Sequence, residues 1–224
     1  MDIDLAISKG KLWGTKSIGF WSILSLILLQ MKPKSILEIG SGRSTTFFAD
    51  YAYSYSADFI SIEENWEWCD KVIDDLRCMC LPTEYIKHVP VVNGWYDIKT
   101  FDNLVKTKKY DMVFIDGPSG DDRRGHDASM TSLFSASIQS DIVIIDDFHR
   151  PSSRRYAESV FQIGNHSTII TMDYVQRQHG SRRCDKIDTV NNQIAFVVKD
   201  LHLEIINSAF ISAGVSFLQH HSDS

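Results

Sequence analysis

The sequence lacks an apolar run long enough to cross a membrane. Its most apolar stretch, residues 17–31, is short and interrupted by serines, whereas a membrane-spanning helix needs about 20 consecutive apolar residues. We expect this stretch to form a buried helix instead. The opening residues, Met-Asp-Ile-Asp, carry no secretory signal pattern, so we expect a cytoplasmic protein without a membrane span.

Cysteine is scarce, and its spacing excludes the usual structural zinc sites. The four cysteines stand at positions 69, 78, 80 and 184. Cys78 and Cys80 are one residue closer than a zinc knuckle requires, and no histidine pair accompanies them. We interpret all four as reduced thiols, which is usual for a protein of the cytosol.

The sequence has fewer basic than acidic residues, and it has no linker-like segment. The chain has 23 Lys and Arg against 29 Asp and Glu, which gives a net charge of -6. Nucleic-acid-binding proteins usually carry a basic excess or stripe, so we do not expect a nucleic-acid partner. No repeat, low-complexity tract or Pro/Gly-rich linker divides the 224 residues. We expect one domain over 1–224, with an N-terminal helical segment at 1–33 and a C-terminal extension at 201–224.

Apolar runs typical of buried strands alternate with helical patterns along the chain. Strands are expected at 35–39, 58–63, 85–92, 110–116, 141–146, 167–173 and 192–199. Helices are expected at 17–31, 44–54, 65–78, 97–106, 127–138 and 152–163. This alternation predicts a Rossmann-like, doubly wound α/β fold, with helices on both faces of a mostly parallel seven-stranded sheet. Residues 203–218 fit a strand or an amphipathic helix equally well.

The most informative stretch runs from Ser35 to Thr46. Residues 35–39 read as a buried strand, and Gly40 and Gly42 allow a tight turn and the close approach of a ligand. The hydroxyls that follow the turn can begin a helix. A strand, a glycine turn and an open helix N-terminus together form a site for part of a nucleotide-like ligand.

A third glycine is missing from this turn. A dinucleotide site would have the pattern Gly-x-Gly-x-x-Gly, and here its last position is Thr45. Pyrophosphate also needs bare backbone N–H groups and tolerates a carboxylate such as Glu38 poorly. S-adenosylmethionine carries a sulfonium and an ammonium group but no phosphate, so Glu38 favours it as the ligand. A nucleotide-dependent oxidoreductase on the same fold is the alternative.

Further candidate residues end the next strands of the predicted sheet. Glu63 lies about twenty residues past the glycines, where an acid can hold the hydroxyls of an adenosine ribose. Trp95 and Tyr96 could flank an adenine or pack in the core. Asp116 ends the strand at 110–116. Ligands of such sheets bind beyond the carboxyl ends of the strands, where all of these residues lie.

With these motifs, the chain resembles the class I S-adenosylmethionine-dependent methyltransferases over residues 33–200. It is similar to the small O-methyltransferases of that superfamily, including the catechol O-methyltransferase type, in which acids end strands 4 and 5. The resemblance implies a cofactor site lined by Glu38, Gly40, Gly42, Glu63, Trp95 and Tyr96. We predict that Ser41, Ser44, Thr45 and Asp116 also belong to it. The catechol enzymes place a lysine base three residues after the strand-4 acid, and this chain has Ser119 there.

The resemblance also implies that Asp116, Asp146 and Asp147 could hold a divalent metal. Three converging carboxylates repel one another without a cation or a proton, which favours an oxygen-ligated ion such as Mg²⁺. The alternative is that Asp146 or Asp147 caps the following helix.

His149 is the leading general-base candidate because the ordinary pKa of histidine is near neutrality. Asp116 and Asp147 complete the predicted catalytic set, and His126 is a weaker candidate. The alternative for His149 is an exposed loop histidine. We predict an S-adenosylmethionine-dependent methyltransferase that methylates a hydroxyl of a small polar or glycosidic acceptor. A methyltransferase-like binding subunit without turnover is the alternative, and the oligomeric state stays open.

Overall fold

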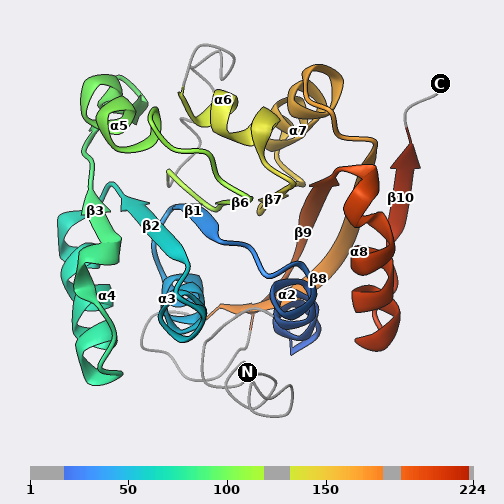
Figure 1. Cartoon of the computed structure of the whole chain (residues 1–224), viewed down its shortest axis with the longest axis horizontal. Helices are drawn as coiled ribbons and strands as arrows, with labels where there is room; N and C mark the ends of the chain where they lie inside the picture. Colours follow the sequence, from blue (N-terminus) through green and yellow to red (C-terminus); the bar gives the residue numbers. More distant parts are fainter. Residues whose placement is uncertain (1–17, 119–131, 179–187, 222–224) are drawn as a thin grey trace.

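A computed structural model describes residues 18–118, 132–178 and 188–221 of the chain. At its centre lies an eight-stranded sheet with the order β10-β8-β9-β7-β6-β1-β2-β3 (Figure 1). Its strands are β1 (Ser35–Ile39), β2 (Asp58–Glu63), β3 (Ile86–His88), β6 (Met112–Ile115), β7 (Ile142–Ile145), β8 (Thr168–Gln178), β9 (Asp188–Val198) and β10 (Leu218–His221). Strands β3, β2, β1, β6 and β7 are parallel, whereas β9, β8 and β10 join through antiparallel pairs.

Helices cover both faces of this sheet. Figure 1 shows α5, α6 and α7 on one side and α2, α3, α4 and α8 on the other. Their bounds are α2 (Ile18–Met31), α3 (Arg43–Tyr55), α4 (Trp66–Cys78), α5 (Ile98–Val105), α6 (Ser132–Gln139), α7 (Pro151–Ile163) and α8 (Asp200–Ser212). A short 3₁₀ helix, Thr83–Tyr85, precedes β3. Each parallel strand therefore ends at the edge where the next helix begins, and this edge is where ligands of such folds bind.

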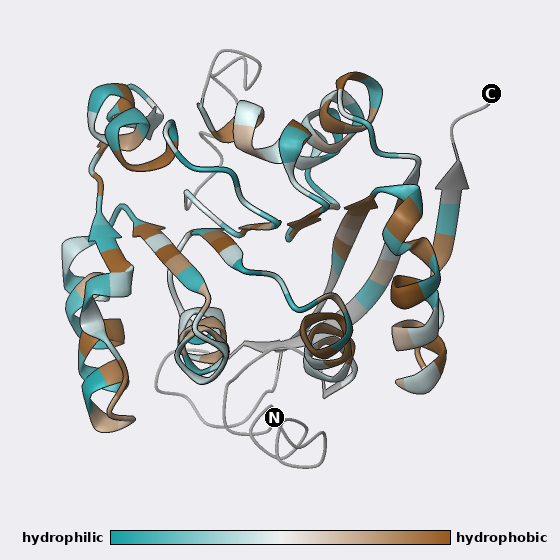
Figure 2. Ribbon diagram, viewed as in Figure 1, coloured by the Kyte–Doolittle hydropathy of each residue, from teal (hydrophilic) through white to brown (hydrophobic). Residues whose placement is uncertain are grey.

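The central strands alternate their side chains between two hydrophobic cores. In β6, Met112 and Phe114 belong to the core beneath α2 and α3. Val113 and Ile115 belong to the core beneath α5, α6 and α7. Successive strand residues point to opposite faces, so a strand covered on both sides must be apolar throughout. Figure 2 shows apolar residues on β7 and β9, and a mixture of polar and apolar residues on helices such as α4 and α5.

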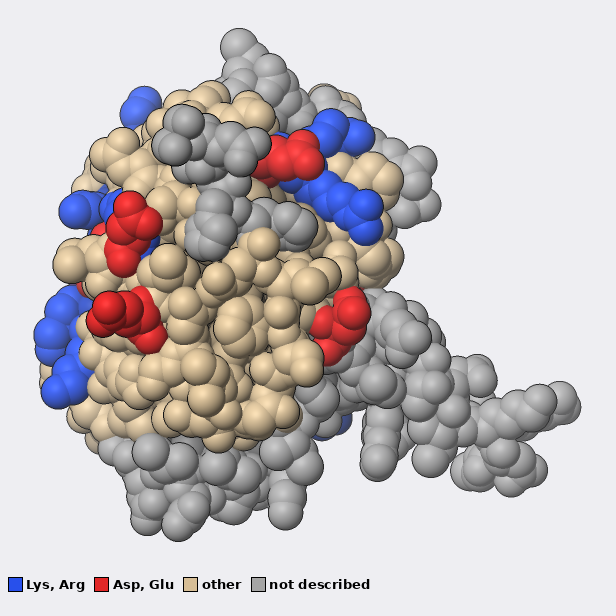
Figure 3. All heavy atoms as spheres, turned by 90° about the vertical axis from the view of Figure 1, so that its right-hand side faces the viewer, with Lys and Arg blue, Asp and Glu red and all other residues tan. Residues whose placement is uncertain are grey.

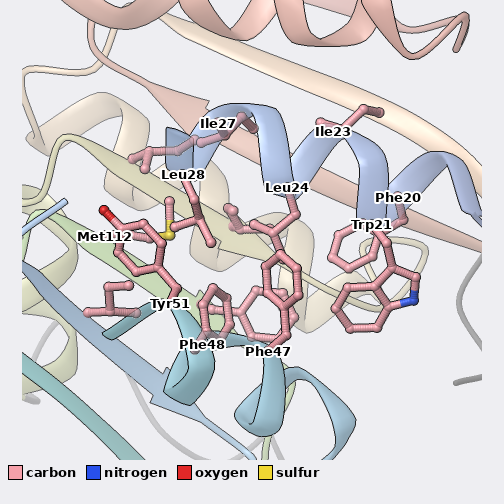
Figure 4. Close-up of a cluster of buried hydrophobic side chains, with 14 of the residues drawn as sticks. Phe20, Trp21, Ile23, Leu24, Ile27, Leu28, Phe47, Phe48, Tyr51 and Met112 are labelled. Carbon is pink, nitrogen blue, oxygen red and sulfur yellow. The ribbon is translucent and has the colours of Figure 1, made fainter. Parts of the chain in front are cut away.

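Helix α2 is apolar around most of its circumference because it packs against α8 and shares one hydrophobic core with α3 and the sheet. In Figure 4, Trp21 and Leu24 of α2 lie over Phe47 and Phe48 of α3. The rings of Trp21 and Phe47 have centroids 5.3 Å apart. Both side chains are about 1% exposed. The predicted N-terminal helix is thus an integral part of the core.

The expected α/β architecture is confirmed, with one strand more than the seven predicted. The extra strand, β10, comes from the 201–224 extension, where the sequence pattern fitted a helix or a strand. The structure contains both, since α8 is followed by β10. Figure 3 looks onto this edge, whose described surface carries only a few separate charged groups.

The predicted strand at 85–92 is shorter than expected. It ends at His88, and Val91–Val92 (β4) instead pairs with Trp95–Tyr96 (β5) in a small hairpin. Asn93 and Gly94 join the two strands with positive φ angles of 54° and 81°. An Asn-Gly pair favours this kind of two-residue turn, so local turn chemistry ended the strand.

None of the helices in the described part of the chain combines the length and apolarity that crossing a membrane requires.

Candidate functional site

The glycine turn after β1 lies against the end of β6. Gly40 has a φ of +87°, and a Cβ added to it would lie 2.6 Å from the Gly117 backbone nitrogen. The Gly40 N–H donates to the Ile62 carbonyl at 2.8 Å, and the Asp116 N–H donates to the Ile39 carbonyl at 2.8 Å. The ends of three neighbouring strands are therefore joined at one point, and glycine is required there.

The backbone donors of this turn are already occupied by side chains. The Ser41 N–H donates to Glu63 Oε2 at 2.8 Å. The Gly42 N–H donates to Thr45 Oγ1 at 2.7 Å. Bare N–H groups are what a glycine turn offers to pyrophosphate. Because these two are bonded within the protein, the turn is poorly prepared for a phosphate ligand.

Glu38 supports the turn from the side of the core. Its side chain is fully buried. Its Oε2 accepts hydrogen bonds from Ser61 Oγ at 2.6 Å and Thr45 Oγ1 at 2.7 Å. Thr45 thus links Glu38 to the Gly42 N–H, and the cofactor contacts predicted for both residues stay predictions.

Glu63 closes a ring of hydrogen bonds that joins β1, β2 and α4. Besides the Ser41 N–H, it accepts from Ser41 Oγ at 3.1 Å and, through Oε1, from the Asn65 N–H at 2.9 Å. Asn65 Oδ1 accepts from the Trp68 N–H at 2.8 Å, so Asn65 caps α4. The Trp68 indole Nε1–H donates to the Ser41 carbonyl at 2.8 Å. This Glu63–Asn65–Trp68–Ser41 ring encloses the start of α4 and the glycine turn.

A pocket of about 350 Å³ opens at this ring, beyond the carboxyl ends of the strands. Its volume falls in the range of small-molecule sites. The described residues that line it are Gly40, Ser41, Glu63, Glu64, Asn65, Glu67, Trp68, Lys71, Asp116 and Gly117. Four of these are acids and one is a lysine, so the pocket favours a ligand that carries positive charge.

Burial acts on the carboxyl group of Glu63. Its side chain is about 4% exposed. Loss of solvent, together with the neighbouring Glu64 carboxylate, raises the pKa of Glu63 above its ordinary value, although the N–H groups of Asn65 and Ser41 oppose the shift. A carboxylate offers about four lone-pair sites, so its contacts within the ring leave room for a ligand hydroxyl.

Four of the predicted cofactor residues line this pocket, namely Gly40, Ser41, Glu63 and Asp116. The others lie outside its lining, namely Glu38, Gly42, Ser44, Thr45, Trp95 and Tyr96. Trp95 and Tyr96 are buried in the hairpin, where both rings pack near Phe101 of α5. Tyr96 nevertheless touches the site, because its hydroxyl donates to Glu64 Oε2 at 3.1 Å.

Sequence reasoning missed the contribution of α4, which provides Glu67, Trp68 and Lys71 to the pocket. A signal was present in Asn65, a helix-capping residue directly after the strand that ends in Glu63. Side chains in the first turn of a helix tilt back toward its N-terminus. The first turn of α4 therefore faces the same edge of the sheet as Glu63.

The described residues do not support the predicted magnesium site. They contain no group of three or more His, Cys, Asp or Glu side chains that could hold a metal ion. Asp147 lies in a left-handed conformation with φ 53°, and its carboxylate pairs with Arg150 at 2.8 Å. Asp146 Oδ1 accepts the Asp147 N–H at 2.9 Å. The two neighbouring acids thus serve the turn before α7.

His149 lies exposed in the turn between β7 and α7 and is not part of the pocket lining. Its predicted role as general base is not tested by this geometry and stays a prediction. Ser119, His126 and Cys184 lie outside the described residues.

No protein-family model and no curated protein sequence matches this chain. Solved structures do resemble it. Cofactor-bound Rv0187 from MTB is 16% identical, with a TM-score of 0.53 over 81% of this chain and 80% of that one. A "putative caffeoyl-CoA O-methyltransferase from Staphylococcus aureus" is 16% identical, with a TM-score of 0.51 over 88% of this chain and 92% of that one.

The Rossmann-like α/β fold is shared with both of these structures. At these sequence identities, the likeness shows a shared fold. The reaction and the acceptor must be inferred from the residues of the site.

Proposed function

We propose that this protein is an S-adenosylmethionine-dependent methyltransferase. The main support for this proposal is that the backbone N–H groups of the glycine turn are already hydrogen-bonded within the protein. The Ser41 and Gly42 N–H groups are bonded to Glu63 and Thr45, and acids dominate the pocket beside them. This arrangement suits a sulfonium and an ammonium group better than a pyrophosphate. The likeness of the fold to a cofactor-bound protein and to a "putative caffeoyl-CoA O-methyltransferase" supports the same proposal.

Within the pocket, Glu63 would accept hydrogen bonds from the ribose hydroxyls, and Asp116 would hold the cofactor amine. The backbone of Gly40 can approach a ligand closely because no side chain intervenes. Bound S-adenosylmethionine would supply a methyl group activated by the positive sulfur. The protein's part would be to position the acceptor oxygen in line with that methyl and to take up the hydroxyl proton.

For the acceptor, we propose a small polar, glycosidic or anionic molecule with a free hydroxyl. Three arginines follow β7 on the turn and first turns of α7, namely Arg150, Arg154 and Arg155. Arg150 is paired with Asp147, and Arg154 Nε donates to the Phe148 carbonyl at 3.1 Å. The exposed Arg155 remains available to a negatively charged acceptor. His149 in the same turn is the proposed base, and no step is assigned to a metal.

Calorimetry with S-adenosylhomocysteine and NAD tests the cofactor. We expect binding of the homocysteine product and none of NAD. Glu63→Gln should weaken binding by about 1.5–3 kcal/mol, the range for a hydrogen bond to a charged group, or roughly 10- to 150-fold. Asp70→Asn is the matched control, because Asp70 is exposed on α4 outside the pocket lining. Micromolar NAD binding without binding of S-adenosylhomocysteine would favour the oxidoreductase alternative.

Methyl transfer itself separates an enzyme from a binding subunit. Protein incubated with methyl-labelled S-adenosylmethionine and a panel of polar hydroxyl compounds should transfer label to at least one of them. With that acceptor, His149→Ala should lower turnover by about 10²–10⁴, the usual effect of removing a general base. Cofactor binding without transfer to any acceptor would support the binding-subunit alternative.

A further inference from the structure

Trp68 occupies an unusual position for a large aromatic side chain. It stands in the first turn of α4, is 42% exposed and lines the pocket. Its indole N–H donates to the Ser41 carbonyl across 27 positions of sequence. The ammonium group of Lys71 lies over the ring, 5.3 Å from its centroid. A half-exposed indole is thereby held in one orientation at the mouth of the site.

The hydrogen bonds around Trp68 form a closed circuit with Glu63. Ser41 donates its N–H to Glu63 and accepts the indole N–H on its carbonyl, so both sides of this residue are fixed. Asn65 joins the other half, because it donates to Glu63 and accepts from the Trp68 backbone. Loss of the indole bond would leave the Ser41 carbonyl without its contact to α4, while Ser41 would stay bonded to Glu63 and Gly40 would keep its backbone hydrogen bond to Ile62.

We propose that Trp68 is a positioning residue, which keeps Ser41 and Glu63 in their binding arrangement before the ligand arrives. The inference rests on the proposed cofactor role of Glu63. A preformed carboxylate binds a ligand more tightly than one that must be ordered during binding, because the ordering cost has already been met by the fold. Trp68 acts through Ser41 and need not touch the ligand itself.

Two substitutions at position 68 distinguish the contribution of the indole N–H from that of the aromatic ring. Trp68→Phe keeps an aromatic wall but removes the donor, and it should weaken S-adenosylhomocysteine binding by about 2- to 12-fold, the equivalent of one net hydrogen bond. Trp68→Leu also removes the aromatic wall and should weaken binding at least as much. Trp66→Phe is the matched control, since Trp66 is 60% exposed on the same helix and is absent from the pocket lining.

A pH profile distinguishes positioning from simple loss of stability. The hydrogen bonds from Ser41 lower the pKa of Glu63 and so counter the effect of burial. If Trp68→Phe loosens Ser41, the Glu63 pKa should rise, and the acid midpoint of ligand affinity should move to higher pH. The other charged or titratable groups near Glu63 are Glu64, Glu67, Cys69, Lys71 and Asp116, and all are unchanged in this variant. The same midpoint should stay in place in Trp66→Phe.

If Trp68→Phe binds S-adenosylhomocysteine with the affinity and the acid midpoint of the wild-type protein, the positioning role is overturned and the proposed function stays intact. Wild-type protein that binds neither S-adenosylhomocysteine nor adenosine would overturn both. Urea unfolding of each variant at neutral pH, with and without S-adenosylhomocysteine, shows whether the binding measurements were made on folded protein.

Discussion

Gly40 and Gly117 lie against each other at the ends of two neighbouring parallel strands. A Cβ on Gly117 would lie 2.7 Å from Gly40 Cα and 2.8 Å from the Tyr96 hydroxyl. The two glycines come from turns more than seventy residues apart in sequence, yet neither leaves room for a side chain on the other. This contact sets the floor of the pocket, because both residues line it.

Alanine at either glycine should destabilise the protein. A Cβ that meets rigid backbone at under 3 Å forces the two turns apart, and overpacking of this kind costs about 1–3 kcal/mol. Gly40→Ala adds the cost of a left-handed backbone for a residue with a side chain, about 1–2 kcal/mol. Urea unfolding measures the loss.

Gly214→Ala is the control for this experiment. Gly214 has a φ of +64°, but a Cβ there would meet nothing within 4 Å. Gly214→Ala should show only the backbone contribution to the loss of unfolding free energy. If its loss is as large as that of Gly40→Ala, the contact between Gly40 and Gly117 contributes nothing.

Thr45→Val should destabilise the turn through lost hydrogen bonds. Its hydroxyl accepts from the Gly42 N–H and donates to the buried carboxylate of Glu38. A buried polar group that loses its partner costs about 1–3 kcal/mol. Thr46→Val is the neighbouring control, because Thr46 Oγ1 donates only within the helix, to the Arg43 carbonyl at 2.9 Å. Equal unfolding midpoints for the two variants would contradict the role given to Thr45.

Acid should destabilise the protein through His166. Burial, with a smaller contribution from the Lys199 ammonium, lowers the pKa of His166 from 6.5 to about 4. The unfolded chain therefore binds the proton more readily than the folded one in this interval. The stabilising contribution is complete above pH 6.5 and is lost as the pH falls toward 4, up to about 3 kcal/mol in total.

Unfolding midpoints at several pH values between 4 and 7 test this. In His166→Leu, the unfolding midpoint should fall less between pH 7 and pH 4 than in the wild-type protein. His149→Gln, in an exposed turn, should show the same fall as the wild-type protein. A decline that is just as steep in His166→Leu would place the acid sensitivity elsewhere.

Leu24→Ala should cost about 2–5 kcal/mol, as is usual for a fully buried leucine. Leu24 is completely buried between α2 and α3 (Figure 4). Leu26 is only partly buried on the same helix, so Leu26→Ala should cost clearly less. A similar small loss from both variants would show that α2 is not part of the cooperative core.

The sequence predicted the sheet well because its strands are buried on both faces and read as continuous apolar runs. Met112–Ile115 and Ile142–Ile145 are examples, and both occupy central positions. The α8–β10 extension could not be assigned from the pattern alone. Its strand is only four residues long and pairs with β8, a contact that no local signal predicts.

At the site, the predicted cofactor residues that line the pocket are those tied to the ends of strands, namely Gly40, Ser41, Glu63 and Asp116. The sequence could not indicate contacts that depend on how neighbouring elements pack. Trp95 and Tyr96 follow a strand as ligand contacts would, but the Asn93-Gly94 turn folds them onto α5. Asp147 stands next to Asp146 in sequence, yet its carboxylate pairs with Arg150 in the turn before α7. Trp68 was missed because its partner, Ser41, lies in the distant glycine turn after β1.

The sheet order also has a consequence for synthesis of the chain on the ribosome. Within the described residues, β8 pairs only with β9 and β10, and both emerge after it. The strands β1, β2, β3, β6 and β7 can pair as they appear, because each finds a neighbouring strand among the residues already synthesised. β8 must wait until residues 188–198 arrive and insert between it and β7. Nascent chains stalled before residue 188 should therefore resist protease across the parallel strands while β8 is still cleaved.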